Sequence, residues 1–89
     1  MATVMFTQNL LRHVESPAAR ADGGTVREVL EGYFAIHPQV RGYVLDDQGA
    51  LRKHVAIFRN RDAIRDRTGL SDPVHGDDDL FVVQLLSGG

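Results

Sequence analysis

The residues of this sequence best suited to covalent chemistry are the last two, Gly88 and Gly89, which follow an apolar run and Ser87. The reactive group is the α-carboxylate of Gly89, and such a group has a reference pKa of about 3.3 to 3.7. It is ionised at neutral pH and becomes an acyl donor only after one of its oxygens is made a leaving group. Because glycine has no Cβ, this pair could pass through a narrow channel. The ending therefore predicts a substrate for another enzyme.

Few other groups on the chain could compete in such a reaction. The 89 residues include no cysteine, so no side chain can act as a thiolate or carry a persulfide. Any sulfur chemistry must therefore use the terminal carboxylate. Lys53 carries the only ε-amine, because the other nine cationic residues are arginines, whose guanidinium groups are poor nucleophiles.

The remaining candidate clusters favour structural roles. The acidic run at 77–79 is predicted to form a solvated turn, with steering of an arginine-rich partner as a minor role. Ser87 lies on a tail that cannot hold a catalytic geometry, and no glycine-rich loop leads into a lysine to bind phosphate. We predict no metal site, since no two histidines lie three or four residues apart: His13, His37, His54 and His75. We predict no enzymatic activity, because no serine, histidine and acid set with a nucleophile motif is found.

Length and charge restrict the class of protein. A chain of 89 residues with 43% apolar content fits one small domain. The net charge of −2 gives no broad cationic surface for nucleic acid or anionic lipid. The sequence lacks a leader-like start and any run of eighteen apolar residues. We therefore predict a soluble cytoplasmic protein that binds neither nucleic acid nor membranes.

Two strands and a helix are predicted in the first half. Residues 3–8 alternate, with Val4 and Phe6 on one side, as in a half-buried strand. Residues 16–21 form a weaker second strand with its alanines pointing inward. Thr25 and Glu28 have the spacing of a capping box, so a helix should begin there and end before Pro38. Its apolar stripe has three-and-four spacing: Val26, Val29, Leu30, Tyr33 and, at the edge, Phe34.

The second half is predicted to add two strands. Residues 43–45 lead into a turn at 46–49 and a strand at 51–58. A polar turn at 60–62 and a glycine- and proline-containing loop follow, and the last strand covers 80–86. The order indicates an α+β domain, a mixed sheet with one helix packed on one face.

The last strand predicts an exposed apolar face, because it does not alternate with polar residues as a sheet with one wet face should. If Leu80 and Val82 point at the helix, the residues between and after them point at solvent. Exposing apolar groups is disfavoured by roughly 25 cal/mol for each Å² that could be buried. We therefore predict a partner-binding patch made of Phe58, Phe81, Val83 and Leu86, with Ala56 beside it.

Six stretches spread over the whole chain resemble the ubiquitin-like β-grasp family, and within it the sulfur-carrier branch called the MoaD/ThiS family. These stretches are residues 4–6, 10–12, 25–28, 55–60, 76–78 and 88–89. Only the last of them is a specific functional motif. The resemblance implies a β-grasp domain over 1–86 and a flexible Ser-Gly-Gly tail over 87–89.

The resemblance also implies a reaction in which this chain is the co-substrate. A ubiquitin-activating-type enzyme would adenylate Gly89, and sulfur would then displace AMP to leave a thiocarboxylate. ATP and magnesium would bind to that partner, and no cofactor is expected on this chain. A second partner, a synthase or a sulfhydrylase, would accept the sulfur for molybdopterin, thiamine, cysteine or methionine synthesis or for another product.

Two other functions remain open from the sequence. A protein modifier would join Gly89 to lysines of target proteins through an isopeptide bond. A plain β-grasp interaction module would bind its partners without covalent chemistry, and its glycine ending would be incidental.

Overall fold

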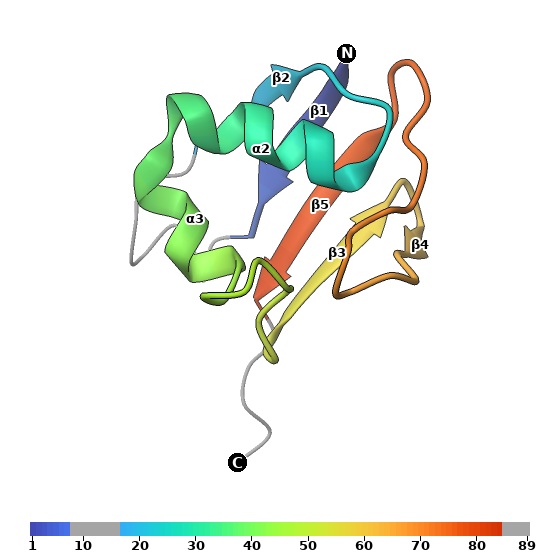
Figure 1. Cartoon of the computed structure of the whole chain (residues 1–89). Helices are drawn as coiled ribbons and strands as arrows, with labels where there is room; N and C mark the ends of the chain where they lie inside the picture. Colours follow the sequence, from blue (N-terminus) through green and yellow to red (C-terminus); the bar gives the residue numbers. More distant parts are fainter. Residues whose placement is uncertain (8–16, 85–89) are drawn as a thin grey trace.

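The computed structural model describes residues 1–7 and 17–84, and they form two layers, a sheet and the helices in front of it (Figure 1). The predicted order of strands and helix is confirmed, with one further helix and one further strand. The elements in chain order are β1 (Ala2–Phe6), β2 (Ala19–Ala21), α2 (Val26–Ile36), α3 (Pro38–Val44), β3 (Val55–Arg59), β4 (Asp62–Ala63) and β5 (Asp79–Gln84).

The five strands form one mixed sheet in the order β2-β1-β5-β3-β4. The central strand β5 runs parallel to β1 and antiparallel to β3, and the outer pairs are antiparallel. The last strand of the described chain is therefore hydrogen-bonded on both sides. This pairing fixes its end, Gln84, opposite Val55 of β3.

The core lies between the sheet and the two helices. Val4, Leu80 and Val82 are almost fully buried, as the sequence predicts for the inner face. The helix stripe is buried with them: Val26, Val29, Leu30, Tyr33 and Phe34. Tyr33 reaches the edge of the core, where its hydroxyl donates a hydrogen bond to the Pro17 carbonyl at 2.6 Å, and burial raises the pKa of its phenol to about 12.

The predicted capping box begins α2. The Thr25 hydroxyl oxygen accepts a hydrogen bond from the Glu28 amide at 3.2 Å, and the Glu28 carboxylate accepts one from the Gly24 amide at 2.8 Å. Gly23 is needed at this tight entry, because a Cβ there would lie 2.7 Å from the Glu28 Cβ and from the Val29 nitrogen. The helix therefore begins at the residue that the sequence predicts.

The expectation of a single helix is wrong. Pro38 does end α2, but it also occupies the first turn of α3, a position that suits proline because no amide donor is needed there. Val40 and Val44 of α3 are fully buried, so both helices cover the same face of the sheet. No helix in the described part of the chain is long and apolar enough to span a membrane.

The strand predicted at 51–58 begins four residues later and ends one residue later in the structure, where β3 covers Val55–Arg59. Leu51 makes only an isolated bridge with Leu45, and β3 begins at Val55 after a turn. The polar segment at 60–62 forms the tight connection to the short strand β4, with Asn60 at a φ of 57°. Asparagine tolerates this left-handed conformation better than most residues.

Candidate functional site

The predicted reactive residues follow the end of the central strand. Gly88 and Gly89, together with Leu86 of the predicted patch, lie outside the described residues. The nearest described position is Gln84, whose amide donates a hydrogen bond to the Thr7 hydroxyl at 3.3 Å. The last described residue is thus held on one side by β3, where it pairs with Val55, and on the other by Thr7, which directly follows β1.

Three predicted patch residues lie together on the sheet face that points away from the helices. The register places Phe81 opposite Phe58, and Val83 opposite Ala56. The Phe81 side chain is 40% exposed, and Phe58 and Val83 are half-buried. Their neighbours along β5 point into the core, so the apolar run at the chain end does serve two faces of the sheet.

Two further apolar residues extend this row across the sheet. Met5 of β1 lies opposite Phe81, and Ala63 of β4 lies opposite Phe58. Adjacent strands lie about 4.8 Å apart, so the four side chains make a row about 15 Å wide. We call Met5, Ala56, Phe58, Ala63, Phe81 and Val83 the outer patch. The sequence analysis missed Met5 and Ala63, because their places depend on pairings between distant segments.

The outer patch continues toward the end of β5 and stops toward its start. Two residues before Phe81 in β5, the outward pair is Asp79 and Thr3, which are polar. Two residues after Phe81, the outward pair is Val83 and Ala56, which are apolar. The apolar surface therefore leads to the end of the strand from which residues 85–89 continue.

Asp77 and Asp78 of the acidic run lie in a turn before the last strand, as predicted, and Asp79 is the first residue of β5. Asp77 makes an exposed ion pair with Arg20 at 2.9 Å. The Asp78 carboxylate accepts hydrogen bonds from the His75 amide and from the Asn60 side chain, which lower its pKa. No group of three potential metal ligands occurs in the part of the chain that the structure describes.

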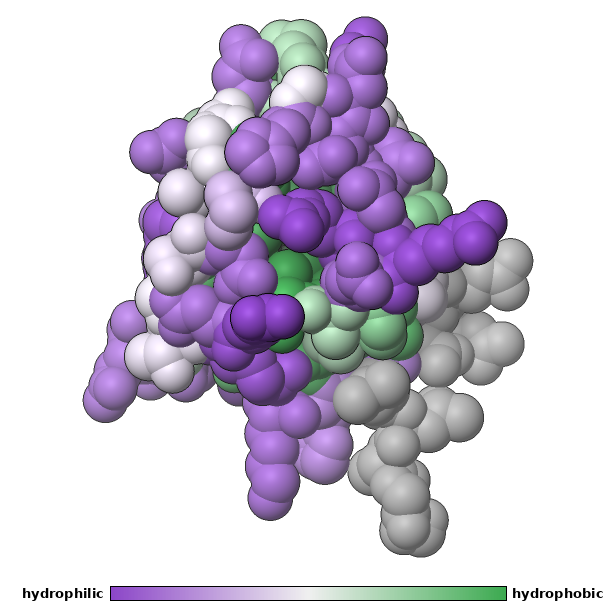
Figure 2. Space-filling model, turned by 90° about the vertical axis from the view of Figure 1, so that its right-hand side faces the viewer, coloured by the Kyte–Doolittle hydropathy of each residue, from purple (hydrophilic) through white to green (hydrophobic). Residues whose placement is uncertain are grey.

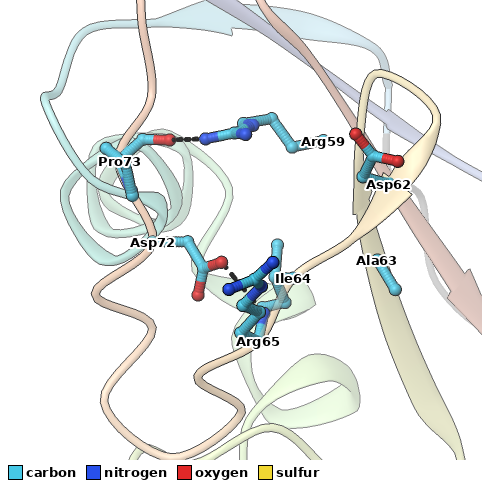
Figure 3. Close-up of a pocket in the computed structure, with 7 residues that line it drawn as sticks. All are labelled: Arg59, Asp62, Ala63, Ile64, Arg65, Asp72 and Pro73. Carbon is cyan, nitrogen blue, oxygen red and sulfur yellow. Dashed lines mark hydrogen bonds between the residues drawn. The ribbon is translucent and has the colours of Figure 1, made fainter.

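A surface hollow of about 520 Å³ lies beside β4, on the side of the molecule that Figure 2 shows. That surface is mostly hydrophilic, with a small hydrophobic area near its centre. Figure 3 shows the lining side chains, which are Arg59, Asp62, Ala63, Ile64, Arg65, Asp72 and Pro73. The sequence analysis did not predict this hollow.

Two of the four charged side chains that line the hollow, Arg59 and Asp72, form hydrogen bonds within the described residues. Arg59 donates to the Pro73 carbonyl, and the Asp72 carboxylate accepts hydrogen bonds from the Arg65 and Asp66 amides at 2.9 and 2.8 Å. These amides lower the pKa of Asp72. The described lining includes no serine, cysteine, histidine or lysine, and the carboxylates of Asp62 and Asp72 are its only groups that could act as a base. The hydrogen bonds of Arg59 and Asp72 join the loop before β5 to β3 and to the segment after β4.

Comparison with known proteins identifies the fold. No protein-family model matches the sequence, and no curated protein matches it. Among solved structures, SAMP1 from Haloferax volcanii is 25% identical, with a TM-score of 0.78 over 99% of this chain and 98% of that one. CysO of Amycolatopsis orientalis, in a complex with BexX, is 22% identical, with a TM-score of 0.83 over both full chains. CysO of Mycobacterium tuberculosis is 21% identical, with a TM-score of 0.81 over 97% of this chain and 100% of that one.

These similarities confirm the predicted fold class, a ubiquitin-like β-grasp. They extend over nearly the whole of each chain, so no large part of either protein lacks a counterpart. The structural neighbours are small ubiquitin-like proteins of the sulfur-carrier and modifier kind, as the sequence resemblance implies. Such neighbours fit a role other than that of an enzyme.

Proposed function

We propose that this protein is a sulfur carrier whose Gly89 carboxylate is adenylated by a partner enzyme and then converted into a thiocarboxylate. The observation that supports this most directly is a glycine pair placed four and five residues after Gln84, the last residue of the central strand of a β-grasp sheet. The strand fixes the start of the tail at Gln84, and residues without a Cβ would not shield the terminal carboxyl group from an attacking atom.

The chemistry needs two steps on the partner enzyme. The Gly89 carboxylate attacks the α-phosphorus of ATP, and pyrophosphate leaves to give an acyl-adenylate. Sulfide then attacks the acyl carbon, and AMP departs with the electron pair of the broken C–O bond. Where the sulfur comes from a persulfide, a thiol must afterwards reduce the acyl disulfide. ATP and magnesium are bound by the partner, and the need for ATP fits a cytoplasmic location.

The outer patch is the proposed docking surface for this partner. Binding would remove Phe81 and its neighbours from water, and aromatic residues at the centre of an interface commonly contribute most of its binding energy. CysO of Amycolatopsis orientalis is in a complex with BexX in its solved structure. We propose that this chain likewise binds partner enzymes. It binds an adenylating enzyme first and then a sulfur acceptor, such as a synthase or a sulfhydrylase.

Protein modification is the second candidate. A neighbour at 23% identity and a TM-score of 0.75 is described as a small archaeal modifier protein. The same acyl-adenylate would then transfer Gly89 to an amine of a target protein, with loss of AMP and a proton.

Mass spectrometry of the intact protein distinguishes the two functions. The chain is incubated with ATP, the ubiquitin-activating-type enzyme of its own organism and sulfide. Replacement of one oxygen by sulfur supports the carrier, and covalent adducts on other proteins support the modifier. Gly89→Val should abolish both products, whereas the matched tail variant Ser87→Ala should leave them unchanged. Normal adenylation of a chain that lacks Gly89 would refute the mechanism.

A further inference from the structure

A basic turn lies at the same end of the sheet as Gln84, from which residues 85–89 continue. We call Gln84 the root of the tail. Lys53 belongs to the turn at 52–54 that precedes Val55, and Val55 pairs with Gln84. Arg67 joins this turn from the loop after β4, because its guanidinium donates to the Arg52 carbonyl at 2.8 Å. We call Arg52, Lys53 and Arg67 the basic turn.

None of these three cations is paired with a carboxylate among the described residues. Arg52 donates from Nε to the Gly42 carbonyl at 2.6 Å, and Arg67 donates to a carbonyl as well. Lys53 is exposed. In the preceding turn, the Asp46 carboxylate accepts hydrogen bonds from the Gln48 and Ala50 amides. Asp47 is exposed, and neither of these two acids forms an ion pair with the basic turn.

The two ends of β5 therefore differ in how their charged groups are paired. At the start of the strand, Asp77 forms an ion pair with Arg20. At its end, next to Gln84, the three cations of the basic turn form no ion pair within the described residues. Unpaired cations of this kind can orient a molecule as it approaches an acidic surface.

The reach of the tail forces this end close to the partner. Five residues separate Gln84 from the carboxylate of Gly89, and an extended chain covers at most about 3.6 Å per residue, or about 18 Å in total. ATP bound on the partner must therefore lie within that distance of Gln84. The partner surface around its active-site entrance has to approach the basic turn.

We infer that the basic turn docks against a rim of carboxylates around the active-site entrance of the adenylating enzyme. This inference rests on the proposed function and adds the chemistry of the partner surface. Cations brought against a neutral or cationic rim would lose hydration without gaining a partner, which is unfavourable. Carboxylates would instead pair with Arg52, Lys53 and Arg67 and attract the chain tail first.

The test compares Lys53→Glu with Arg61→Glu, two variants with the same change of charge at opposite ends of β5. Both side chains are exposed and have no hydrogen bond or ion pair to another described residue. The measurement is kcat/KM for ATP–pyrophosphate exchange by the adenylating enzyme at limiting chain concentration. At low salt, Lys53→Glu should lower it roughly tenfold and Arg61→Glu less than about twofold. At about 1 M salt, where the Debye length is about 3 Å, the difference should vanish.

Two results would overturn the inference: equal losses in the two variants at low salt, or a Lys53→Glu loss that salt leaves unchanged. Unchanged unfolding midpoints would show that both variants are folded. If the wild-type chain itself supports no exchange, the proposed function fails and this inference falls with it. Exchange by the wild type with equal rates for the variants removes the inference alone.

Discussion

The two faces of β5 have nearly the same composition and opposite environments. Leu80 and Val82 on the inner face are 0% and 1% exposed, whereas Phe81 between them is 40% exposed. The inner pair packs under the helices, and the outer residue has no layer above it. The difference shows that one apolar segment can stabilise the fold with one face and leave apolar side chains exposed on the other.

The largest expected effect is on the inner face. Leu80→Ala should lower the free energy of unfolding by about 2–5 kcal/mol, because it leaves a cavity in a closed core. The neighbouring Phe81→Ala should lower it by less, about 1–2 kcal/mol, because 40% of that residue is already exposed to solvent. Urea unfolding of the two variants measures both. Equal losses would remove the distinction between the faces.

The next effect is on the outer face. Phe81→Asp should weaken binding to the adenylating enzyme by about 2 kcal/mol, or roughly thirtyfold, while the domain stays folded. Ile36→Asp is the matched control, because Ile36 is the more exposed residue at 71% and lies at the end of α2, away from the outer patch. Titration calorimetry gives both affinities. An equal loss for Ile36→Asp would mean that the outer patch has no special role.

A smaller effect is expected where the helical layer begins. Thr25→Ala removes the acceptor of the Glu28 amide and should lower the free energy of unfolding by about 1 kcal/mol. Thr25→Ser keeps the hydroxyl and should restore most of the stability. Thermal unfolding followed by circular dichroism measures both variants. Partner binding should stay unchanged, since α2 covers only the inner face.

The smallest effect concerns the stability, in acid, of the loop that contains Asp66. Hydrogen bonds from the Ser71 hydroxyl and from the Gly69, Ser71 and Thr68 amides lower the pKa of Asp66 to about 2. Its pKa in the unfolded chain is higher, near 3.9, so the stabilisation is complete above about pH 4 and is lost as the pH falls toward 2. Asp66→Asn should make unfolding less dependent on pH in that range. An unaltered pH profile of the unfolding midpoint would contradict this assignment.

Local signals predicted α2 well and α3 not at all. Thr25, Glu28 and Pro38 mark the ends of α2, and its apolar stripe has helical spacing. The seven residues of α3 contain a glycine and only two buried side chains, Val40 and Val44. Helices this short are unstable alone, so α3 depends on packing against the core.

The candidate site was likewise predictable only in part from local signals. The apolar run at the end of the chain was enough to predict that Phe81 and Val83 face outward. The contributions of Met5 and Ala63 were not predictable, because each depends on a strand register between distant segments. The basic turn was also missed, because Arg52 and Arg67 are fifteen residues apart and meet through a carbonyl hydrogen bond.

The sequence by itself determined the glycine ending, the absence of cysteine, the capped helix and the excess of apolar residues in the last strand, because each is a property of residue types and short spacings. Tertiary structure alone decided which strands flank β5, which side chains complete the outer patch and which charges surround the root of the tail. These depend on pairings across the whole chain, where the free energy of packing selects one register among many that local preferences allow.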